Sequence, residues 1–212
     1  MGNEIIDKRF KLVAQKVIKH LEARHMEGYY AETKEEALET ALKLIPENSV
    51  VSWGGSVSIS EIGLKQAVKE GPYTAIDRDT AANPAERKQL MKQALTADVF
   101  LMGTNAITED GQLVNLDGLG NRVAALCYGP DIVIVIAGRN KLVPTLEDAV
   151  VRTRKYAAPV NAQRFSETAC QKDGACHDCL MKDCICGKLV ITRCDMVYGR
   201  VKVILVGEEL GY

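Results

Sequence analysis

The first segment whose residues could do chemistry is a short glycine loop, Trp53-Gly54-Gly55-Ser56. It follows a strand-like apolar run at residues 50–53 and precedes a helical stretch that begins at about Ser58. Two glycines allow the backbone to approach a ligand closely, and backbone N–H groups at the start of a helix favour phosphate or carboxylate. The sequence therefore predicts an anion site at Gly54, Gly55 and Ser56, and the alternative is a tight turn in which Ser58 caps the helix.

A second segment, residues 103–122, is rich in polar residues and follows the apolar run at 99–102. Asp110-Gly111 predicts a hairpin turn within it. The other polar residues offer hydrogen-bond donors, acceptors and one fixed cation at the end of a strand, where open α/β sheets bind ligands. The ligand-binding residues predicted in this segment are Thr104, Asn105, Asn115, Gly118, Asn121 and Arg122.

Three charged residues of this segment have predicted roles. Arg122 could bind a carboxylate through two parallel hydrogen bonds. Glu109 or Asp117 would move a proton or attack a carbonyl carbon, and these two acids are therefore the candidate catalytic residues. The alternative is that Glu109 is a structural acid in a turn and Arg122 is a surface charge.

The third segment holds six of the seven cysteines, between residues 170 and 194. Cys176-His177-Asp178-Cys179 has the Cys-x2-Cys spacing that suits zinc or an iron–sulfur cluster, without the regular repeats of a ferredoxin or the paired knuckles of a zinc ribbon. The alternatives to a metal are reduced thiols packed as small apolar groups and a thiol pair that forms a disulfide on oxidation. Cys127 lies in a helical stretch and is predicted to be in the core.

The apolar pattern predicts the elements that position these segments. Apolar residues at helical spacing over 4–27, and Thr33 with Glu36 as a capping box, predict two N-terminal helices. Apolar runs that alternate with helical stretches follow at 50–53, 73–76, 99–102 and 132–136. The last of these runs is apolar at every position, which is typical of a parallel strand covered on both faces. The fold class predicted is α/β, a layered and mostly parallel sheet covered by helices on both faces, with closing strands at 189–192 and 201–206.

Length and charge limit the remaining possibilities. A chain of 212 residues can bury a core without disulfides, and we expect a single domain over 1–212. Lys and Arg number 27 and Asp and Glu 28, and the absence of a charged block argues against a nucleic-acid or membrane partner. Without a secretory signal or a run of about 18 apolar residues, the expected location is the cytoplasm. The predicted subdivision is N-terminal helices at 1–47, an α/β core at 48–165, a cysteine-rich insertion at 166–196 and a closing strand at 197–212.

Five motifs together carry a resemblance to a known family. They are Trp53-Gly54-Gly55-Ser56, Gly103-Thr104-Asn105-Ala106-Ile107-Thr108-Glu109-Asp110-Gly111, Asp117-Gly118-x-Gly120-Asn121-Arg122, Ala157-Ala158-Pro159-x-Asn161-Ala162 and Val206-Gly207-Glu208-Glu209-Leu210-Gly211-Tyr212. On these motifs the chain resembles the lactate-utilization (LUD) domain family over nearly its whole length. The family is similar to a superfamily that includes glucosamine-phosphate deaminase, ribose-phosphate isomerase, CoA transferases and the methenyl-folate synthetase, which bind their ligands at loops that follow strands.

The resemblance implies a site at the Gly54-Gly55-Ser56 loop and the 105–122 segment, and places Glu109 near the acid that relatives use as nucleophile or base. In a short-chain subgroup with a C-terminal cysteine motif, the pattern maps onto Cys170, Cys176, Cys179 and Cys186. The resemblance implies that zinc or an iron–sulfur cluster, if present, is held by these four cysteines. Because lactate-utilization operons pair such domains with iron–sulfur subunits, it also implies a link to a lactate or organic-acid oxidation complex.

Three hypotheses about function remain open at this stage. The preferred one is binding of a small anionic metabolite, such as a carboxylate, a sugar phosphate or an acyl-CoA, with isomerase-like or transferase-like chemistry if the protein is an enzyme. The second is an accessory redox or electron-transfer module that uses the cysteine cluster, through a metal or through thiols. The third is a structural partner in an enzyme complex, and the expected assembly is a homodimer.

Overall fold

The computed structural model describes residues 2–165 and 167–212. The α-helices are α1 (Gly2–Ala23), α2 (Lys34–Lys43), α3 (Val57–Glu61), α4 (Leu64–Glu70), α5 (Pro84–Gln93), α6 (Asn121–Cys127), α7 (Leu146–Val151), α8 (Ala158–Ala162) and α9 (Ala169–Asp173). The strands are β1 (Glu27–Ala31), β2 (Val50–Trp53), β3 (Thr74–Ile76), β4 (Val99–Gly103), β5 (Ala106–Thr108), β6 (Leu113–Asp117), β7 (Ile132–Gly138), β8 (Leu142–Val143), β9 (Lys188–Thr192) and β10 (Val201–Val206). Short 3-10 turns η1 (Arg78–Thr80), η2 (Ala94–Thr96) and η3 (Arg139–Lys141), and the π-helical turn η4 (Arg152–Ala157), complete the order.

The main sheet has six strands in the order β1-β10-β7-β4-β2-β3, and every pair in it is parallel. Its central strand β7 shows why both faces are covered: Val133, Val135 and Ala137 pack with α1 and α6, while Ile134 and Ile136 pack on the opposite face with α2, α3 and α4. Each side chain of β7 is thus buried on one face or the other. The predicted fold class, a mostly parallel sheet with helices on both faces, is confirmed.

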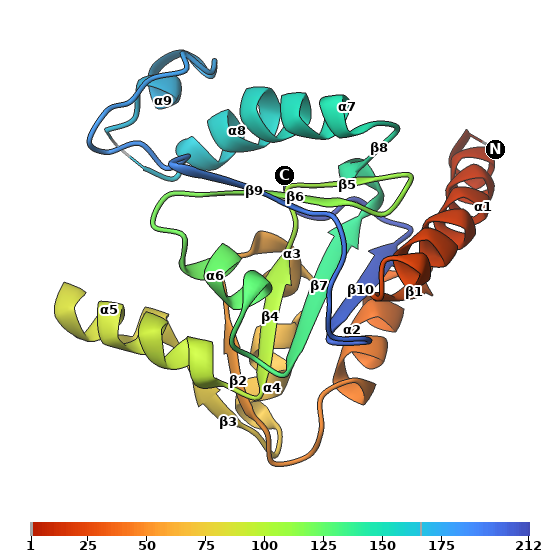
Figure 1. Ribbon diagram of the computed structural model, residues 1–212, viewed down its shortest axis with the longest axis horizontal. Helices are drawn as coiled ribbons and strands as arrows, with labels where there is room; N and C mark the ends of the chain where they lie inside the picture. The colour runs from red at the N-terminus through yellow and green to blue at the C-terminus, as the bar shows by residue number, and fades with distance from the viewer. Residues whose placement is uncertain (1, 166) are drawn as a thin grey trace.

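A second sheet, in the order β8-β5-β6-β9, lies across the end of the first. β5 and β6 form the hairpin that Asp110-Gly111 predicts, with Ala106 opposite Val114 and Ile107 opposite Leu113. Figure 1 shows α7, η4 and α8 running over this sheet on the side away from the main sheet. Both sheets therefore contribute to the region at the carboxyl ends of β4 and β7.

The N-terminal region differs from its prediction as two helices. β1 lies between α1 and α2, and forms an edge of the main sheet against β10. Gly28 packs closely on α1, since a Cβ at this position would lie 2.9 Å from Cγ1 of Ile18, and the tyrosines that follow it favour a strand. The strand is only five residues long, so it gives a weak signal in the sequence.

One further prediction needs correction. Cys127, predicted to be in the core, is exposed because it is the last residue of α6. The strand predicted at 189–192 is present as β9, which belongs to the second sheet and pairs with β6. The first residue of the predicted cysteine-rich insertion, 166, lies outside the described residues. No helix of the described chain is long and apolar enough to cross a membrane.

Candidate functional site

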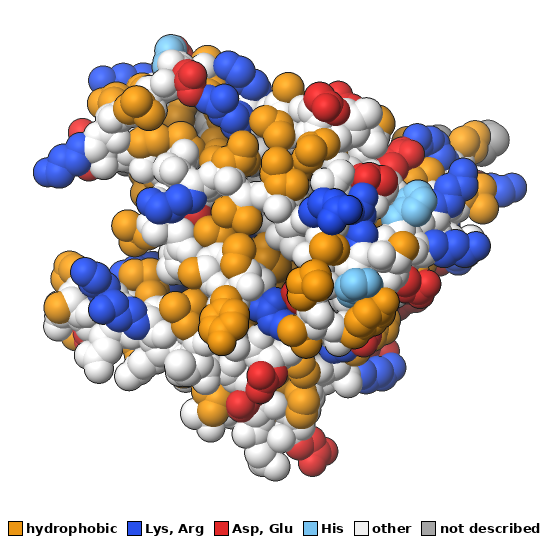
Figure 2. Space-filling model, in the orientation of Figure 1, with side chains coloured by type: hydrophobic (Ala, Val, Ile, Leu, Met, Phe, Trp, Pro, Cys, Tyr) orange, Lys and Arg blue, Asp and Glu red, His pale blue; other side chains and the backbone are white. Residues whose placement is uncertain are grey.

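A cleft of about 1070 Å³ lies at the carboxyl ends of the parallel strands. Its walls come from the loops that follow β2, β3, β4, β7 and β10, together with α5 and part of the cysteine-rich segment. Figure 2 shows this side of the molecule hollowed between α5 and the cysteine-rich segment, with basic side chains along its edges. The place agrees with the rule that open α/β sheets bind ligands beyond the carboxyl ends of their strands.

The lining of the cleft is strongly basic. Its lysines and arginines are Arg78, Arg87, Lys88, Lys92, Arg122, Lys141, Arg164 and Lys182. Asp117 is the one acidic residue among the described residues of the lining. Such an imbalance creates a positive potential inside the cleft, which attracts an anionic ligand.

Arg122 uses all of its side-chain donors inside the protein. Its Nε donates to Asp117 Oδ1 at 2.9 Å, and Nη1 donates to the Gly103 carbonyl and to Asn115 Oδ1 at 2.8 and 2.7 Å. Its Nη2 donates to Asn105 Oδ1 and to the Leu116 carbonyl at 2.8 and 3.1 Å. A guanidinium has five N–H bonds, and each has an acceptor here. Arg122 therefore braces β4 and β6, and the predicted pairing with a ligand carboxylate is not what the structure assigns to it.

Asp117, a candidate catalytic acid, is also engaged. Its Oδ1 accepts from Arg122 Nε, and its Oδ2 accepts from the backbone N–H groups of Arg122 and Val123 at 3.0 and 3.1 Å. The carboxylate thus caps the start of α6 and pairs with the guanidinium. It borders the cleft, and both of its oxygens accept hydrogen bonds from the protein, while its predicted catalytic role stays a prediction.

The other predicted ligand-binding residues of the 103–122 segment divide into two groups. Thr104, Asn105, Gly118 and Asn121 border the cleft. The Thr104 hydroxyl donates to the carbonyls of Ala106 and Val114, so it also supports the hairpin. Asn115 lies beneath the cleft, fully buried, and holds Arg122.

Glu109, the other candidate catalytic acid, lies away from the cleft. It follows β5 in the hairpin turn, where its backbone N–H donates to the Val143 carbonyl and its carbonyl lies 2.7 Å from His20 Nδ1 of α1. The neighbouring Asp110 forms an ion pair with Arg24. Glu109 is not among the residues that line the cleft, so its position gives the predicted catalytic role no support, and that role stays a prediction.

The glycine loop does border the cleft, and each glycine packs against an arginine. A Cβ on Gly54 would lie 3.1 Å from the Cγ and Cδ atoms of Arg122, and a Cβ on Gly55 would lie 2.5 Å from Nη2 of Arg78. Ser56, not Ser58, caps α3, since its Oγ accepts from the Ile59 N–H. Because α3 has only five residues, its dipole adds little at this loop.

Arg78 was not predicted from the sequence, and it contrasts with Arg122. Its side chain is 16% exposed, and its buried Nε has no hydrogen-bond partner among the described residues. Its Nη1 donates to the sulfur of Met91 at 3.6 Å, and its Nε forms an ion pair with Asp79 Oδ1 at 3.9 Å, which is too long for a hydrogen bond. Burial, with the positive charge of Arg87, lowers the pKa of Arg78. A buried guanidinium without a strong acceptor is suited to receive one from a ligand.

Lys141 is a second cationic residue that the sequence did not reveal. It follows β7 in η3, is 4% exposed and borders the cleft. Its Nζ donates to Ser58 Oγ at 2.8 Å, and no carboxylate of the described residues lies within ion-pairing distance. Burial, reinforced by the positive charges of Arg152 and Arg122, lowers the pKa of Lys141 to about 7.

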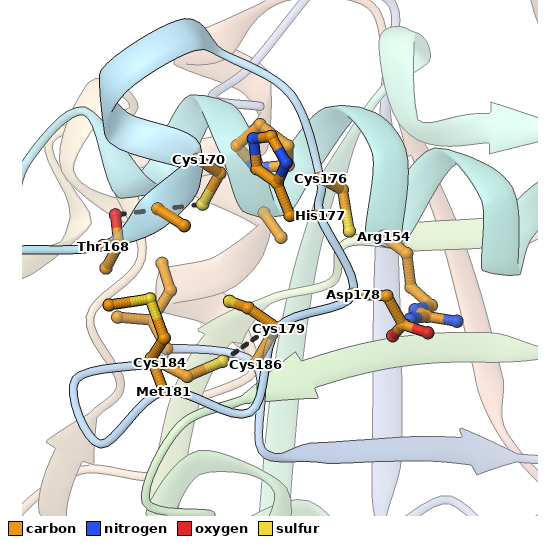
Figure 3. A pocket seen from close by; sticks show the side chains of 14 residues that line it. Arg154, Thr168, Cys170, Cys176, His177, Asp178, Cys179, Met181, Cys184 and Cys186 are labelled. Carbon is orange, nitrogen blue, oxygen red and sulfur yellow. Dashed lines mark hydrogen bonds and ion pairs between the residues drawn. The ribbon is translucent and has the colours of Figure 1, made fainter.

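The cysteine-rich segment forms a small pocket next to the cleft. Five of its thiols line this pocket, namely Cys170, Cys176, Cys179, Cys184 and Cys186. Figure 3 shows them on α9 and on the two turns of the chain that follow it, with the Sγ atoms of Cys184 and Cys186 2.8 Å apart. Burial, with the neighbouring Cys184, raises the pKa of Cys186 to about 12. Cys184 and Ile185 border the large cleft as well.

The thiols have the chemistry of soft-metal ligands, but their arrangement is not that of a metal centre. Within residues 2–165 and 167–212, no group of three or more His, Cys, Asp or Glu side chains is placed to hold a metal ion. The four cysteines of the family motif, Cys170, Cys176, Cys179 and Cys186, line one pocket without converging on one point. A zinc or iron–sulfur centre here stays a prediction.

The sequence profile of a known family, described as the LUD domain, matches residues 14–206 of this chain. The chain belongs to the LUD domain family. No curated protein sequence matches this LUD domain protein.

Several solved structures are similar to the LUD domain protein. A DUF162 family protein from Deinococcus radiodurans is 15% identical, with a TM-score of 0.52 over 93% of this chain and 98% of the other. Ribose 5-phosphate isomerase A from Methanocaldococcus jannaschii is 22% identical, with a TM-score of 0.35 over 53% and 55% of the two chains. For eIF2B beta from Chaetomium thermophilum the values are 20% identity and a TM-score of 0.40 over 54% and 44%. At 15% identity, the likeness to the DUF162 protein concerns the fold alone.

Proposed function

We propose that this LUD domain protein binds a small metabolite that carries a phosphate or carboxylate group, in the cleft at the carboxyl ends of its strands. The observation that carries the proposal is the charge of the lining, where eight basic side chains face one acid, Asp117, which Arg122 already neutralises. Asp79, which lies outside the lining, pairs with Arg87 at 2.9 Å and with Arg78 at 3.9 Å, so the cations still outnumber the acids that pair with them. An excess of cations in a concave site favours an anionic ligand. In this proposal the anion binds to Arg78, whose guanidinium lies over Gly55.

The dimensions of the cleft bear on the class of metabolite. Its volume of about 1070 Å³ is at the upper end of the range for small-molecule sites, so it has room for a ligand of the size of a sugar phosphate and for longer acyl-CoA-like molecules. Leu95, Phe165 and Tyr212 give part of the lining an apolar character that suits such a body. The homodimer, expected from the general preference of soluble proteins for two-fold symmetry, remains a prediction. The link to lactate or organic-acid oxidation, which the family resemblance implies, remains a prediction too.

Isothermal titration calorimetry tests the proposal with inorganic phosphate, ribose 5-phosphate, lactate, pyruvate and acetyl-CoA as probes. We expect at least one anion to bind, with an affinity that falls as salt concentration rises. Arg78→Ala should weaken binding, and the matched control Arg9→Ala, which removes an exposed arginine on α1, should not. If no anion binds the folded protein, or if both variants bind equally well, the proposal is wrong.

We propose a second function for the cysteine pocket, a reversible thiol–disulfide exchange between Cys184 and Cys186. The two Sγ atoms lie 2.8 Å apart, and Cys184 borders both the small pocket and the cleft. A low-molecular-weight disulfide such as glutathione disulfide would accept the two electrons. One protein thiolate attacks it, which forms a mixed disulfide and releases one glutathione thiolate. The second protein thiol, as its thiolate, then attacks the protein sulfur of the mixed disulfide, which forms the Cys184–Cys186 disulfide and releases the second glutathione.

Mass spectrometry after treatment with glutathione disulfide tests this second proposal. The expected result is the loss of two hydrogens per chain and a peptide that links Cys184 to Cys186. Cys184→Ser should prevent this change, while Cys127→Ser, which removes an exposed cysteine outside the pocket, should leave it intact. A stable glutathione adduct on either residue, or no reaction at all, would contradict the exchange.

A further inference from the structure

We propose that Lys141 forms an imine with a carbonyl group of the anionic metabolite bound in the cleft. The inference rests on the anion-binding function proposed above and extends it, because it narrows the ligand to an anion that also carries an aldehyde or ketone. The ligand classes that meet both conditions are 2-oxo acids and the open-chain forms of sugar phosphates.

The position of Lys141 is the first support. The residue follows the central strand β7, and its side chain is almost fully buried yet borders the cleft. Long lysine side chains ordinarily keep the ammonium group in water, so a buried Nζ at a ligand cleft is unusual. Its hydrogen bond to Ser58 Oγ fixes the direction of the amine.

The electrostatic surroundings of Lys141 are the second support. Burial is the largest cause that disfavours protonation of the amine, and the positive charges of Arg152 and Arg122 add to it, while Glu61 favours protonation. A large share of the amine is therefore neutral near pH 7. A neutral amine is the nucleophile that imine formation needs, and lysines desolvated next to cationic groups are activated in this way.

The reaction balances without any further reagent. The nitrogen lone pair of the neutral amine attacks the carbonyl carbon, and a proton passes from nitrogen to the carbonyl oxygen to give a carbinolamine. The C–O bond then breaks, the oxygen leaves as water with the second nitrogen proton, and a C=N bond remains. Ser58 Oγ lies 2.8 Å from Nζ and can accept and return a proton during this transfer. The imine then makes the neighbouring carbon acidic, which prepares the ligand for proton transfer or C–C bond cleavage.

Reductive trapping tests the inference. The full chain is incubated with pyruvate or ribose 5-phosphate and sodium cyanoborohydride, and the modified lysine is located by peptide mass spectrometry. We expect a reduced adduct at Lys141 that forms at least about tenfold faster than at any exposed lysine, because its neutral fraction at pH 7 is far larger. Lys141→Arg should abolish this adduct, and Lys16→Arg, which alters an exposed lysine on α1, should not.

Parallel calorimetry distinguishes failure of this inference from failure of anion binding. If pyruvate or ribose 5-phosphate binds and Lys141 gains no adduct, or other lysines react as fast, the imine is excluded while the anion site stands. If neither the carbonyl-bearing probes nor inorganic phosphate binds, both proposals fail. Circular dichroism of Lys141→Arg, and of a second variant Lys141→Met, checks that loss of the adduct does not reflect loss of the fold. If both folded variants, which lack Lys141, still form the fast adduct, the assignment of the reacting amine to Lys141 is also wrong.

Discussion

Two adjacent glycines, Gly54 and Gly55, each pack against an arginine of the same cleft, and the two arginines have different uses. The stem of Arg122 lies against Gly54, and all five of its side-chain donors have acceptors within the protein. The guanidinium of Arg78 lies over Gly55, and its buried Nε has no acceptor among the described residues. Both are cations at one site, yet only Arg78 retains hydrogen-bonding capacity for a ligand. The number of basic residues in a cleft therefore says less about binding than the acceptors that each of them already has.

Among the substitutions that test this difference between the two arginines, Arg122→Ala is expected to have the largest effect on stability. The substitution leaves Asp117 buried without its cation and frees the carbonyls of Gly103 and Leu116, so the free energy of unfolding should fall by about 3–5 kcal/mol. Denaturant unfolding followed by circular dichroism measures it, and Arg9→Ala should stay within about 0.5 kcal/mol of wild type. A stable Arg122→Ala protein that has lost its ligand would show that Arg122 is the binding arginine after all.

The second effect concerns Lys141, a buried cation that forms no ion pair with a carboxylate of the described residues. Its pKa is about 7 in the folded chain against an ordinary value of 10.5, so between these values the unfolded chain binds more protons. The free energy of unfolding should then rise with pH across this window, by about 1.4 kcal/mol per pH unit. Below about pH 7 both states are protonated and the contribution no longer changes.

Lys141→Met isolates this contribution, because the variant lacks the titrating amine. Relative to the variant, the wild-type protein should gain about 2–3 kcal/mol in the free energy of unfolding from pH 7 to pH 9. Denaturant titrations of both proteins at each pH provide the measurement. A stability difference that stays constant with pH would mean that Lys141 titrates as an ordinary lysine and is not desolvated.

Arg78→Ala tests the same difference between the two arginines through anion affinity. Loss of a hydrogen-bonded cation should weaken anion binding by about 1.5–3 kcal/mol, which is at least about tenfold in affinity. Because Arg78 has few internal partners, the free energy of unfolding should change much less than in Arg122→Ala. Calorimetry and denaturant unfolding of the same two variants give both numbers, and equal losses of stability would remove the distinction between the arginines.

The sequence predicted the strands of the main sheet well because parallel strands buried on both faces are continuously apolar, as at Ile132–Gly138. It failed at β1, where helical spacing runs into a short strand that owes its place to pairing with β10. Pairing between distant segments leaves no local pattern, so such an edge strand becomes visible only in the folded chain.

The sequence predicted where the site lies in the fold, but not what each of its charged residues does. The loop at Gly54-Gly55-Ser56 and the segment that contains Arg122 do meet at one cleft. The use of Arg122 could not be predicted, because its acceptors at Asn105, Asn115 and two backbone carbonyls are brought together only by the folding of β4 onto β6. Lys141 gave one signal in the sequence, since it lies three residues after the end of an apolar strand of a parallel sheet, where sites form.

The smallest effects are expected when each of the two glycines is replaced by alanine. In Gly55→Ala the new methyl group would lie 2.5 Å from Nη2 of Arg78, the far end of a flexible side chain, so the guanidinium should shift and anion affinity should fall by a few-fold with little loss of stability. In Gly54→Ala the methyl group would meet the Cγ and Cδ atoms of Arg122 at 3.1 Å, and these atoms are held by the hydrogen-bond network beyond them. That variant should lose about 1 kcal/mol of stability instead. Calorimetry gives the anion affinity of the two variants, and denaturant unfolding gives their stability. If Gly54→Ala and Gly55→Ala change stability and affinity to the same extent, the distinction between Arg122 as a structural arginine and Arg78 as a binding arginine is wrong.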